Sequence, residues 1–137
     1  STVRILCEAA GPLGMAGGQQ VDLDAKKKKP SSDQLKKINA LKTGALIRAS
    51  TEAAAVWAGG SPGEVRLLRC YGSHVGFLFQ LVDDIIDGDG FAALESEEAV
   101  YARSAKVRDR AKKQLASFKG KAGVLSAFAG FLYNRKY

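Results

Sequence analysis

The feature that most constrains the fold is a long apolar segment that carries helix signals at both ends. It opens with Ser61-Pro62-Gly63-Glu64, which supplies a capping side chain, a proline for the first helical position and a glutamate three residues after the cap. Gly88 is a suitable helix end. Because the second half of the segment has almost no polar surface, we predict that it is the central helix of a bundle. Its apolar side chains recur at helical spacing at Val65, Leu68, Tyr71, Val75, Leu78, Phe79, Val82 and Ile86.

The rest of the chain also favours helices over strands. Residues 32–60 show helical spacing, with Ser32 or Asp33 as the cap and Gly59-Gly60 as the end. Two more amphipathic segments, residues 95–118 and 121–134, are separated by Gly120, and Lys26 to Lys29 is predicted to be a solvated turn. The chain has 137 residues, of which 46% are hydrophobic, and few β-branched or aromatic runs. The expected fold is therefore a single all-α domain, a helical bundle spanning residues 1–137.

The first apolar stretch, Val3 to Leu23, contains several glycines, which need a reason because glycine disfavours helices. They are Gly11, Gly14, Gly17 and Gly18. Their spacing would place several of them near one helix face, where a neighbouring helix could approach closely. The alternative is a loop between two short helices.

The net charge of +7 is distributed unevenly along the chain. Between Cys70 and Ala102 there is no lysine or arginine, so the basic surplus lies outside this window. Seven of the fourteen acidic residues fall inside it, at Asp83, Asp84, Asp87, Asp89, Glu95, Glu97 and Glu98. A helical nucleic-acid-binding module is an unfavoured alternative, because the basic residues do not alternate with stacking aromatic side chains on one face.

The cysteine pattern and the lengths of the apolar runs indicate a cellular location. Cys7 and Cys70 are far apart and match neither a CxxC motif nor a zinc-binding spacing. No stretch approaches the roughly 18 uninterrupted apolar residues that a membrane span needs, and no signal-peptide pattern is present. We expect a soluble protein of a reducing compartment, the cytoplasm.

The acidic end of the central helix is the chemically informative anomaly. Asp83 and Asp87 are four residues apart and share a helix face, Asp84 lies one step round, and Gln80 lies one turn before them. The C-terminal end of a helix carries partial negative charge, so carboxylates are disfavoured there. With no basic residue nearby in the sequence, these aspartates require a cation from elsewhere in the fold or from solution.

Magnesium is the solution cation that suits such a group best, because Mg²⁺ prefers a few carboxylates together with substrate phosphates. A calcium loop that starts at Asp87 fails, since Phe91 falls at its fifth position. A catalytic carboxylate pair is conceivable, but a third carboxylate favours a metal. Aspartates that form a solvated helix end with lysine partners from other helices remain an alternative.

Four sequence blocks resemble the trans-isoprenyl diphosphate synthase family, which includes farnesyl and geranylgeranyl diphosphate synthases. The blocks are GMAGGQQVDL from Gly14, KTGALI from Lys42, YGSHVGFLFQLVDDIID from Tyr71 and, more loosely, the closing FLYNRKY. The order and spacing of the blocks match those of the family as well. The third block, with FQ upstream of a DDxxD motif, is the most specific.

The resemblance implies roles for the aspartates. DDIID resembles the second aspartate-rich motif of the family, in which carboxylates bind Mg²⁺ that holds the allylic diphosphate. Asp83, Asp84 and Asp87 would then be the metal ligands, and Asp83 would also count as catalytic. Ionising an allylic diphosphate leaves a carbocation and pyrophosphate, so positive charge at the leaving group is what the reaction needs.

The resemblance also implies diphosphate-binding residues. Lys42 and Thr43 resemble the lysine and threonine that contact the allylic diphosphate, with Lys42 also catalytic, and Gln80 resembles the glutamine beside them. Gln19 and Asp22 match polar positions that line the cavity. For these last two, a buried polar side chain satisfied by a neighbouring helix is nearly as good an interpretation.

The implied activity is the Mg²⁺-dependent condensation of isopentenyl diphosphate with an allylic diphosphate by a homodimeric enzyme. However, the chain lacks the first aspartate-rich motif, the isopentenyl diphosphate site and the lysine-containing lid expected after Asp87. We therefore expect the C-terminal half of the fold. It could be a fragment, a partly ordered chain or a natural short subunit, and a non-catalytic partner subunit is the main alternative function.

Overall fold

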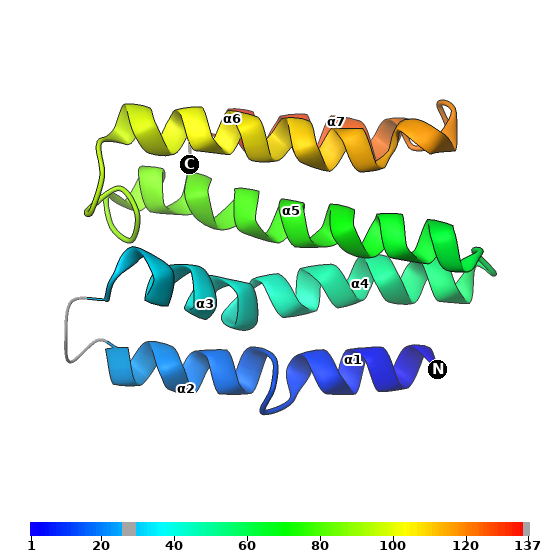
Figure 1. The fold of residues 1–137 in the computed structure, drawn as a ribbon, viewed down its shortest axis with the longest axis horizontal. Helices are drawn as coiled ribbons and strands as arrows, with labels where there is room; N and C mark the ends of the chain where they lie inside the picture. Colours follow the sequence, from blue (N-terminus) through cyan, green and yellow to red (C-terminus); the bar gives the residue numbers. More distant parts are fainter. Residues whose placement is uncertain (26–29, 136–137) are drawn as a thin grey trace.

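The computed structural model describes residues 1–25 and 30–135 (Figure 1). The described residues contain helices and no strand, which confirms the expected all-α fold. The elements, in chain order, are α1 (Thr2–Ala10), α2 (Met15–Ala25), α3 (Ser32–Lys42), α4 (Gly44–Trp57), α5 (Pro62–Asp87), α6 (Glu97–Gln114), the 3₁₀ turn η1 (Ala116–Phe118) and α7 (Gly123–Asn134). None of the described helices combines the length and the apolar character that crossing a bilayer requires.

The helices form a layered bundle in which α5 is central (Figure 1). Helices α1 and α2 follow one another along one edge, and α3 and α4 form the next row. Helix α5 packs between that row and α6, while α7 lies behind α6. The main core surrounds α5, whose Leu78 and Leu81 have no exposed surface. The expected central position of this helix is confirmed.

Both ends of α5 form as the sequence predicts. The Ser61 hydroxyl accepts a hydrogen bond from the Glu64 N–H at 3.3 Å, and the Glu64 carboxylate accepts one from the Ser61 N–H at 2.8 Å. Pro62 occupies the first turn. At the other end Gly88 takes the left-handed conformation, with φ of 68°, that glycine adopts without strain.

The close approach of α4 to α5 depends on glycine. A Cβ atom on Gly76 would lie 2.9 Å from the Gly44 Cα, and one on Gly72 would lie 2.8 Å from the Arg48 Cα. These separations leave no room for a side chain. The paired glycines therefore bring the two helices together next to the Lys42–Thr43 segment.

Residues 3–23, the glycine-rich first stretch, show both features that the sequence allows: a loop between two short helices and a close contact with a neighbouring helix. It is a pair of short helices, α1 and α2, separated at residues 11–14. A glycine in α2 also permits a close contact, since a Cβ atom on Gly18 would lie 2.3 Å from the Lys42 N and 2.7 Å from the Leu41 Cβ. Helix α2 is thereby seated against the end of α3.

Two expectations about residues 30–60 were wrong in detail. The cap of α3 is Ser31, not Ser32 or Asp33, because the Ser31 hydroxyl and the Gln34 side chain complete a capping box. The helix is also not continuous to Gly59, since it breaks at Thr43 between α3 and α4. The predicted turn at Lys26 to Lys29 lies outside the described residues. The predicted separation of the last helices at Gly120 is confirmed, with φ of 84° at that residue.

Candidate functional site

A cavity of about 350 Å³ lies at the C-terminal end of α5. Its walls come from α2, α3, α5 and the segment that joins α5 to α6. Its polar lining residues are Asp22, Asn39, Lys42, Gln80, Asp84 and Asp89, and Leu35 and Ile38 add apolar surface. The cavity thus combines charged and amide groups with an apolar wall.

The break between α3 and α4 places Lys42 in the wall of this cavity and Thr43 beside Gln80. Helix α3 ends at Lys42, and the Thr43 N–H still donates to the Asn39 carbonyl oxygen at 3.3 Å. The Lys42 ammonium group lies 2.7 Å from an Asp22 carboxylate oxygen. The Asp22 side chain is 18% exposed and that of Lys42 is 38% exposed, so the pair is only partly screened by solvent.

A chain of hydrogen bonds links the helix break to the end of α5. The Thr43 hydroxyl donates to Gln80 Oε1 at 3.3 Å, and Gln80 Nε2 donates to Asp84 Oδ1 at 2.7 Å. The Phe91 N–H then donates to Asp84 Oδ2 at 2.9 Å. Gln80 therefore has both ends of its amide engaged, which fixes its orientation in the cavity wall.

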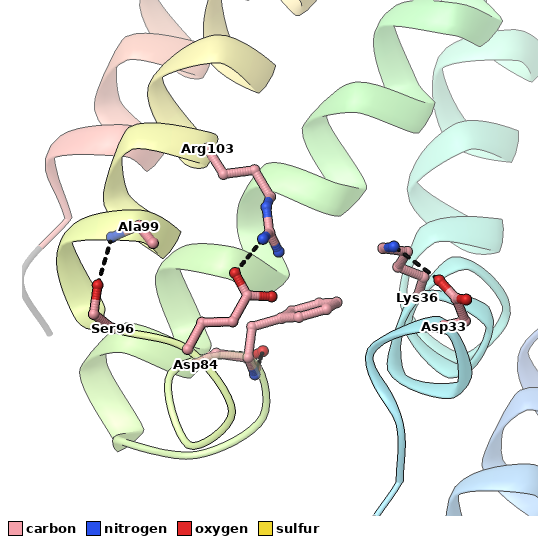
Figure 2. Close-up of polar contacts among 8 residues, drawn as sticks. Asp33, Lys36, Asp84, Ser96, Ala99 and Arg103 are labelled. Carbon is pink, nitrogen blue, oxygen red and sulfur yellow. Dashed lines mark hydrogen bonds and ion pairs between the residues drawn. The ribbon is translucent and has the colours of Figure 1, made fainter.

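Asp84 is buried and serves the segment after α5. It is 3% exposed, and burial raises the pKa of its carboxyl group, while the hydrogen bonds from Phe91 and Gln80 oppose that rise and the nearby Asp89 and Asp83 add to it. Gly90, with φ of 51°, packs directly on this carboxylate, since a Cβ atom there would lie 2.2 Å from Asp84 Oδ2. Figure 2 shows Asp84 at the end of α5, beside the loop that leads to α6.

Asp83 and Asp87 have different surroundings from Asp84. Asp83 is half-buried and pairs with Arg135, the residue that follows α7, at 2.6 Å. The Arg135 guanidinium group also lies over the Phe79 ring, 4.6 Å from its centroid. Asp87 is exposed. The cation that Asp83 requires is therefore supplied, in this chain, by an arginine 52 positions away.

The three aspartates that the resemblance makes metal ligands do not all face the same way. Successive helix positions differ by about 100°, so Asp84 turns into the fold while Asp83 and Asp87 keep solvent contact. Among residues 1–25 and 30–135, no group of three acidic, histidine or cysteine side chains is arranged to hold a metal. Asp84 therefore has different surroundings from Asp83 and Asp87, and the assignment of all three aspartates to a metal stays a prediction.

Of the other expected site residues, the structure brings most together. Asp22, Lys42 and Gln80 line the cavity, and Thr43 joins them through Gln80. Gln19 is exposed on α2 and lies outside the cavity lining.

Sequence reasoning missed Asn39 and Arg135. Asn39 is buried, and its Nδ2 has no hydrogen-bond partner in the described part of the chain. The sequence could have indicated Asn39 as a site residue, because residues three and four apart are neighbours on a helix. Asn39 therefore shares a face of α3 with Leu35 and Lys42. For Arg135 the only signal was its place in the closing block FLYNRKY.

Comparisons with known proteins identify a family. The polyprenyl synthetase family model matches residues 2–95. Farnesyl diphosphate synthase of Escherichia coli is 42% identical over 94 residues, covering 68% of this chain and 31% of the relative. The corresponding enzyme of Bacillus subtilis is 36% identical over 101 residues, covering 74% of this chain and 32% of the relative.

A solved structure extends the similarity to nearly the whole chain. The geranyltransferase of Legionella pneumophila superposes with a TM-score of 0.88 at 34% identity, covering 98% of this chain and 49% of the other. This chain thus spans about a third of the curated relatives and about half of that solved chain. With the family match covering more than half of its residues, the chain belongs to the polyprenyl synthetase family.

Proposed function

We propose that this chain provides the diphosphate-binding side of a prenyltransferase that condenses isopentenyl diphosphate with an allylic diphosphate. The observation that carries the proposal is that Lys42 and the oriented Gln80 line one cavity, while Thr43, at the helix break, is bonded to Gln80. The named activities of the relatives, farnesyl diphosphate synthesis among them, support it. Because the chain spans only part of those relatives, the complete reaction is a property of a larger or assembled protein.

In this proposal the diphosphate is held by groups that can change partner. Lys42 is paired with Asp22 in the absence of substrate, and a diphosphate offers its ammonium group a more highly charged acceptor. Asp22 would then position Lys42 at the cavity edge. Asn39, which lines the cavity, carries a further donor at Nδ2, for which the described residues offer no partner.

The residues fit Mg²⁺ in part. Asp83 and Asp87 lie four positions apart near the helix end and keep solvent contact, which suits a cation that takes one or two carboxylates and retains water. Arg135 occupies Oδ1 of Asp83, so Mg²⁺ would bind Oδ2 or displace this arginine. Asp84 was also expected to be a ligand, but both of its oxygens accept hydrogen bonds inside the fold. We therefore assign Asp83 and Asp87 to Mg²⁺ and give Asp84 a positioning role. When bound, Mg²⁺ would neutralise charge that grows on the leaving diphosphate.

Direct binding tests this proposal. Inorganic pyrophosphate should bind the 137-residue chain more tightly with Mg²⁺ than with EDTA, as measured by titration calorimetry. Asp83→Ala and Lys42→Gln should each remove most of that Mg²⁺-dependent gain, about tenfold or more, because each removes a charged contact. Asp109→Asn, an exposed change on α6, is the matched control. A Mg²⁺-dependent gain that survives Asp83→Ala would overturn the assignment.

The expected assembly and the main alternative can be tested together. We propose that the complete enzyme is a cytoplasmic homodimer, to be tested by cell fractionation and sedimentation. The alternative is a non-catalytic partner subunit, which is favoured by one feature: residues 88–96, between α5 and α6, contain no lysine. Alone, the chain should not turn over isopentenyl and allylic diphosphates. In an active larger assembly, Asp83→Ala should lower turnover about 10²-fold or more, whereas a purely modulatory subunit would tolerate it.

A further inference from the structure

A second cavity, of about 460 Å³, lies between α3, α4, α5 and α6. It shares no lining residue with the cavity of the candidate site. We call it the basic groove, because five basic side chains line it and no acidic one does: Lys36, Arg48, Arg103, Lys106 and Arg110. Such convergence of like charges from several helices is unfavourable unless something negative occupies the space between them.

The chain neutralises only part of this charge. Lys36 pairs with Asp33 at 2.9 Å in an exposed contact, and Arg103 pairs with Glu95. Figure 2 shows Lys36 on α3 and Arg103 on α6 on opposite sides of one space. In the described ranges, 1–25 and 30–135, no ion pair involves Arg48, Lys106 or Arg110.

Two of the guanidinium groups also present unused donors. Arg48 Nε and Arg103 Nη1 are shielded from solvent and have no hydrogen-bond partner among the described residues. Buried donors on charged groups are normally paired, because they forfeit hydration without compensation. Both residues line the basic groove, so their charges add to it, while the two shielded donors can meet a ligand only after their side chains move.

The floor of the groove is apolar. Phe77 and Val107 line it, and the Phe77 ring packs edge-on against Phe91, with centroids 6.0 Å apart. Arg103 lies over the Phe91 ring, 5.4 Å from its centroid. A ligand that matches this surface has an anionic group for the arginines and an apolar body for the floor, in a cavity of ordinary small-molecule size. Guanidinium groups favour phosphate as that anion, because their donors match its oxygens in pairs.

We propose that the basic groove binds a phosphate or diphosphate group carrying an apolar chain, without a divalent cation. This site goes beyond the proposed function, because it uses different residues and needs neither Lys42 nor Asp83. The bound molecule would be held by its charge at Lys106 and Arg110 and by its chain at Phe77 and Val107.

Geranyl diphosphate, titrated into the 137-residue chain in EDTA, is the probe. We expect saturable binding that weakens as salt is added. Lys106→Gln/Arg110→Gln should weaken it about tenfold or more, since two charged contacts are lost. Inorganic pyrophosphate, which lacks the apolar chain, should bind at least about tenfold more weakly than geranyl diphosphate in EDTA.

The matched control is Lys112→Gln/Lys113→Gln, which removes the same charge from exposed positions of α6 outside the groove. It should stay within about twofold of the unmodified chain. All four substituted residues are exposed, so circular dichroism should show an unchanged fold. Equal weakening in both double variants would show that binding depends only on the net charge of the chain, and this would overturn the proposal. The absence of binding to every probe in EDTA would overturn it too.

Two further arms separate the sources of the ligand and the two proposals. Vesicles containing phosphatidate test a lipid headgroup: binding that is lost only in Lys106→Gln/Arg110→Gln assigns a membrane source. Lys42→Gln should leave binding in EDTA unchanged while it lowers Mg²⁺-dependent pyrophosphate binding. If EDTA binding instead fell with Lys42→Gln and not with the groove variant, the basic groove would be excluded and the candidate site would remain.

Discussion

The two ends of α5 are both held by side-chain hydrogen bonds, but the partners come from very different distances along the chain. At the N-terminal end, Ser61 and Glu64 bond to each other across three positions. At the C-terminal end, Gln80 meets Thr43 from 37 positions away, and Asp83 meets Arg135 from 52. The first end needs only its own turn, whereas the second needs α3, α4 and the residue after α7 to be in place.

The N-terminal end of α5 thus has a structural role alone, whereas we assign the C-terminal end a role in diphosphate binding as well. The capping box satisfies free N–H groups of α5, which every helix has. The other end gathers carboxylates where the helix dipole disfavours them, and it orients Gln80 in a cavity. Changes at the C-terminal end should therefore disturb both stability and diphosphate binding, while changes at the N-terminal end should lower stability alone.

The largest effect is expected at Asp84. Asp84→Ala leaves the Phe91 N–H and the Gln80 amide without their acceptor, and we expect a loss of about 3 kcal/mol in the free energy of unfolding. Urea unfolding followed by circular dichroism measures this loss. Because Gln80 loses its orientation, Mg²⁺-dependent pyrophosphate binding should fall as well.

Asp89→Ala is the control for Asp84. Asp89 is exposed and lies in the same segment after α5, so its removal should change stability by no more than about 0.5 kcal/mol. If the two variants lost stability equally, the C-terminal end would not depend on the Asp84 contacts. The contrast between the two ends of α5 would then fail.

A pair of glycines after α5 gives the next effect. Gly88 and Gly90 both have positive φ, 68° and 51°, but a Cβ atom on Gly88 meets nothing within 4 Å, whereas one on Gly90 collides with the Asp84 carboxylate. Gly88→Ala should cost about 1 kcal/mol from backbone strain, and Gly90→Ala about 2 kcal/mol, because it also displaces Asp84. Thermal unfolding of the two variants should resolve the difference. Equal losses would show that the carboxylate can move without cost.

The sequence allowed the helices to be predicted where their signals are local. Ser61, Pro62 and Glu64 stand together in the sequence, and the apolar spacing before Gly88 is long enough to be unambiguous. The cap of α3 was misplaced by one or two residues, because Ser31, Ser32 and Asp33 can all act as caps. The break at Thr43 was missed, since it depends on packing against α2 and α5 and not on a proline or a glycine before it.

The candidate site could be predicted in its residue types but not in its pairing. Lys42, Thr43 and Gln80 were expected together, and the structure links them. Asp84 points into the fold because its carboxylate accepts a hydrogen bond from the Phe91 N–H. Asp83 pairs with Arg135 because α7 ends beside it. Contacts of this kind follow from tertiary packing, which helical spacing does not encode.

The smallest effect is expected at Ser61, and it tests whether the N-terminal end of α5 depends only on contacts within its own turn. Ser61→Ala should lower the free energy of unfolding by about 1 kcal/mol at neutral pH, with Mg²⁺-dependent pyrophosphate binding unchanged.

Hydrogen bonds from the Ser61 hydroxyl and N–H lower the pKa of Glu64 below its ordinary value of 4.5. A carboxyl group with a lowered folded pKa contributes stability above its unfolded pKa and loses it as pH falls through the folded value. The difference between Ser61→Ala and the unmodified chain should therefore shrink below about pH 4.5.

The capping box of α3 supplies the control for this pH dependence. Ser31 is paired there with Gln34 in the same geometry, but glutamine does not titrate, so the loss caused by Ser31→Ala should be the same at pH 7 and pH 4. Urea unfolding of both variants across this range makes the comparison. If both losses shrank alike, the titrating group would lie elsewhere and Glu64 would not be responsible. If neither changed, the N-terminal end of α5 would be held by the Ser61 hydroxyl alone.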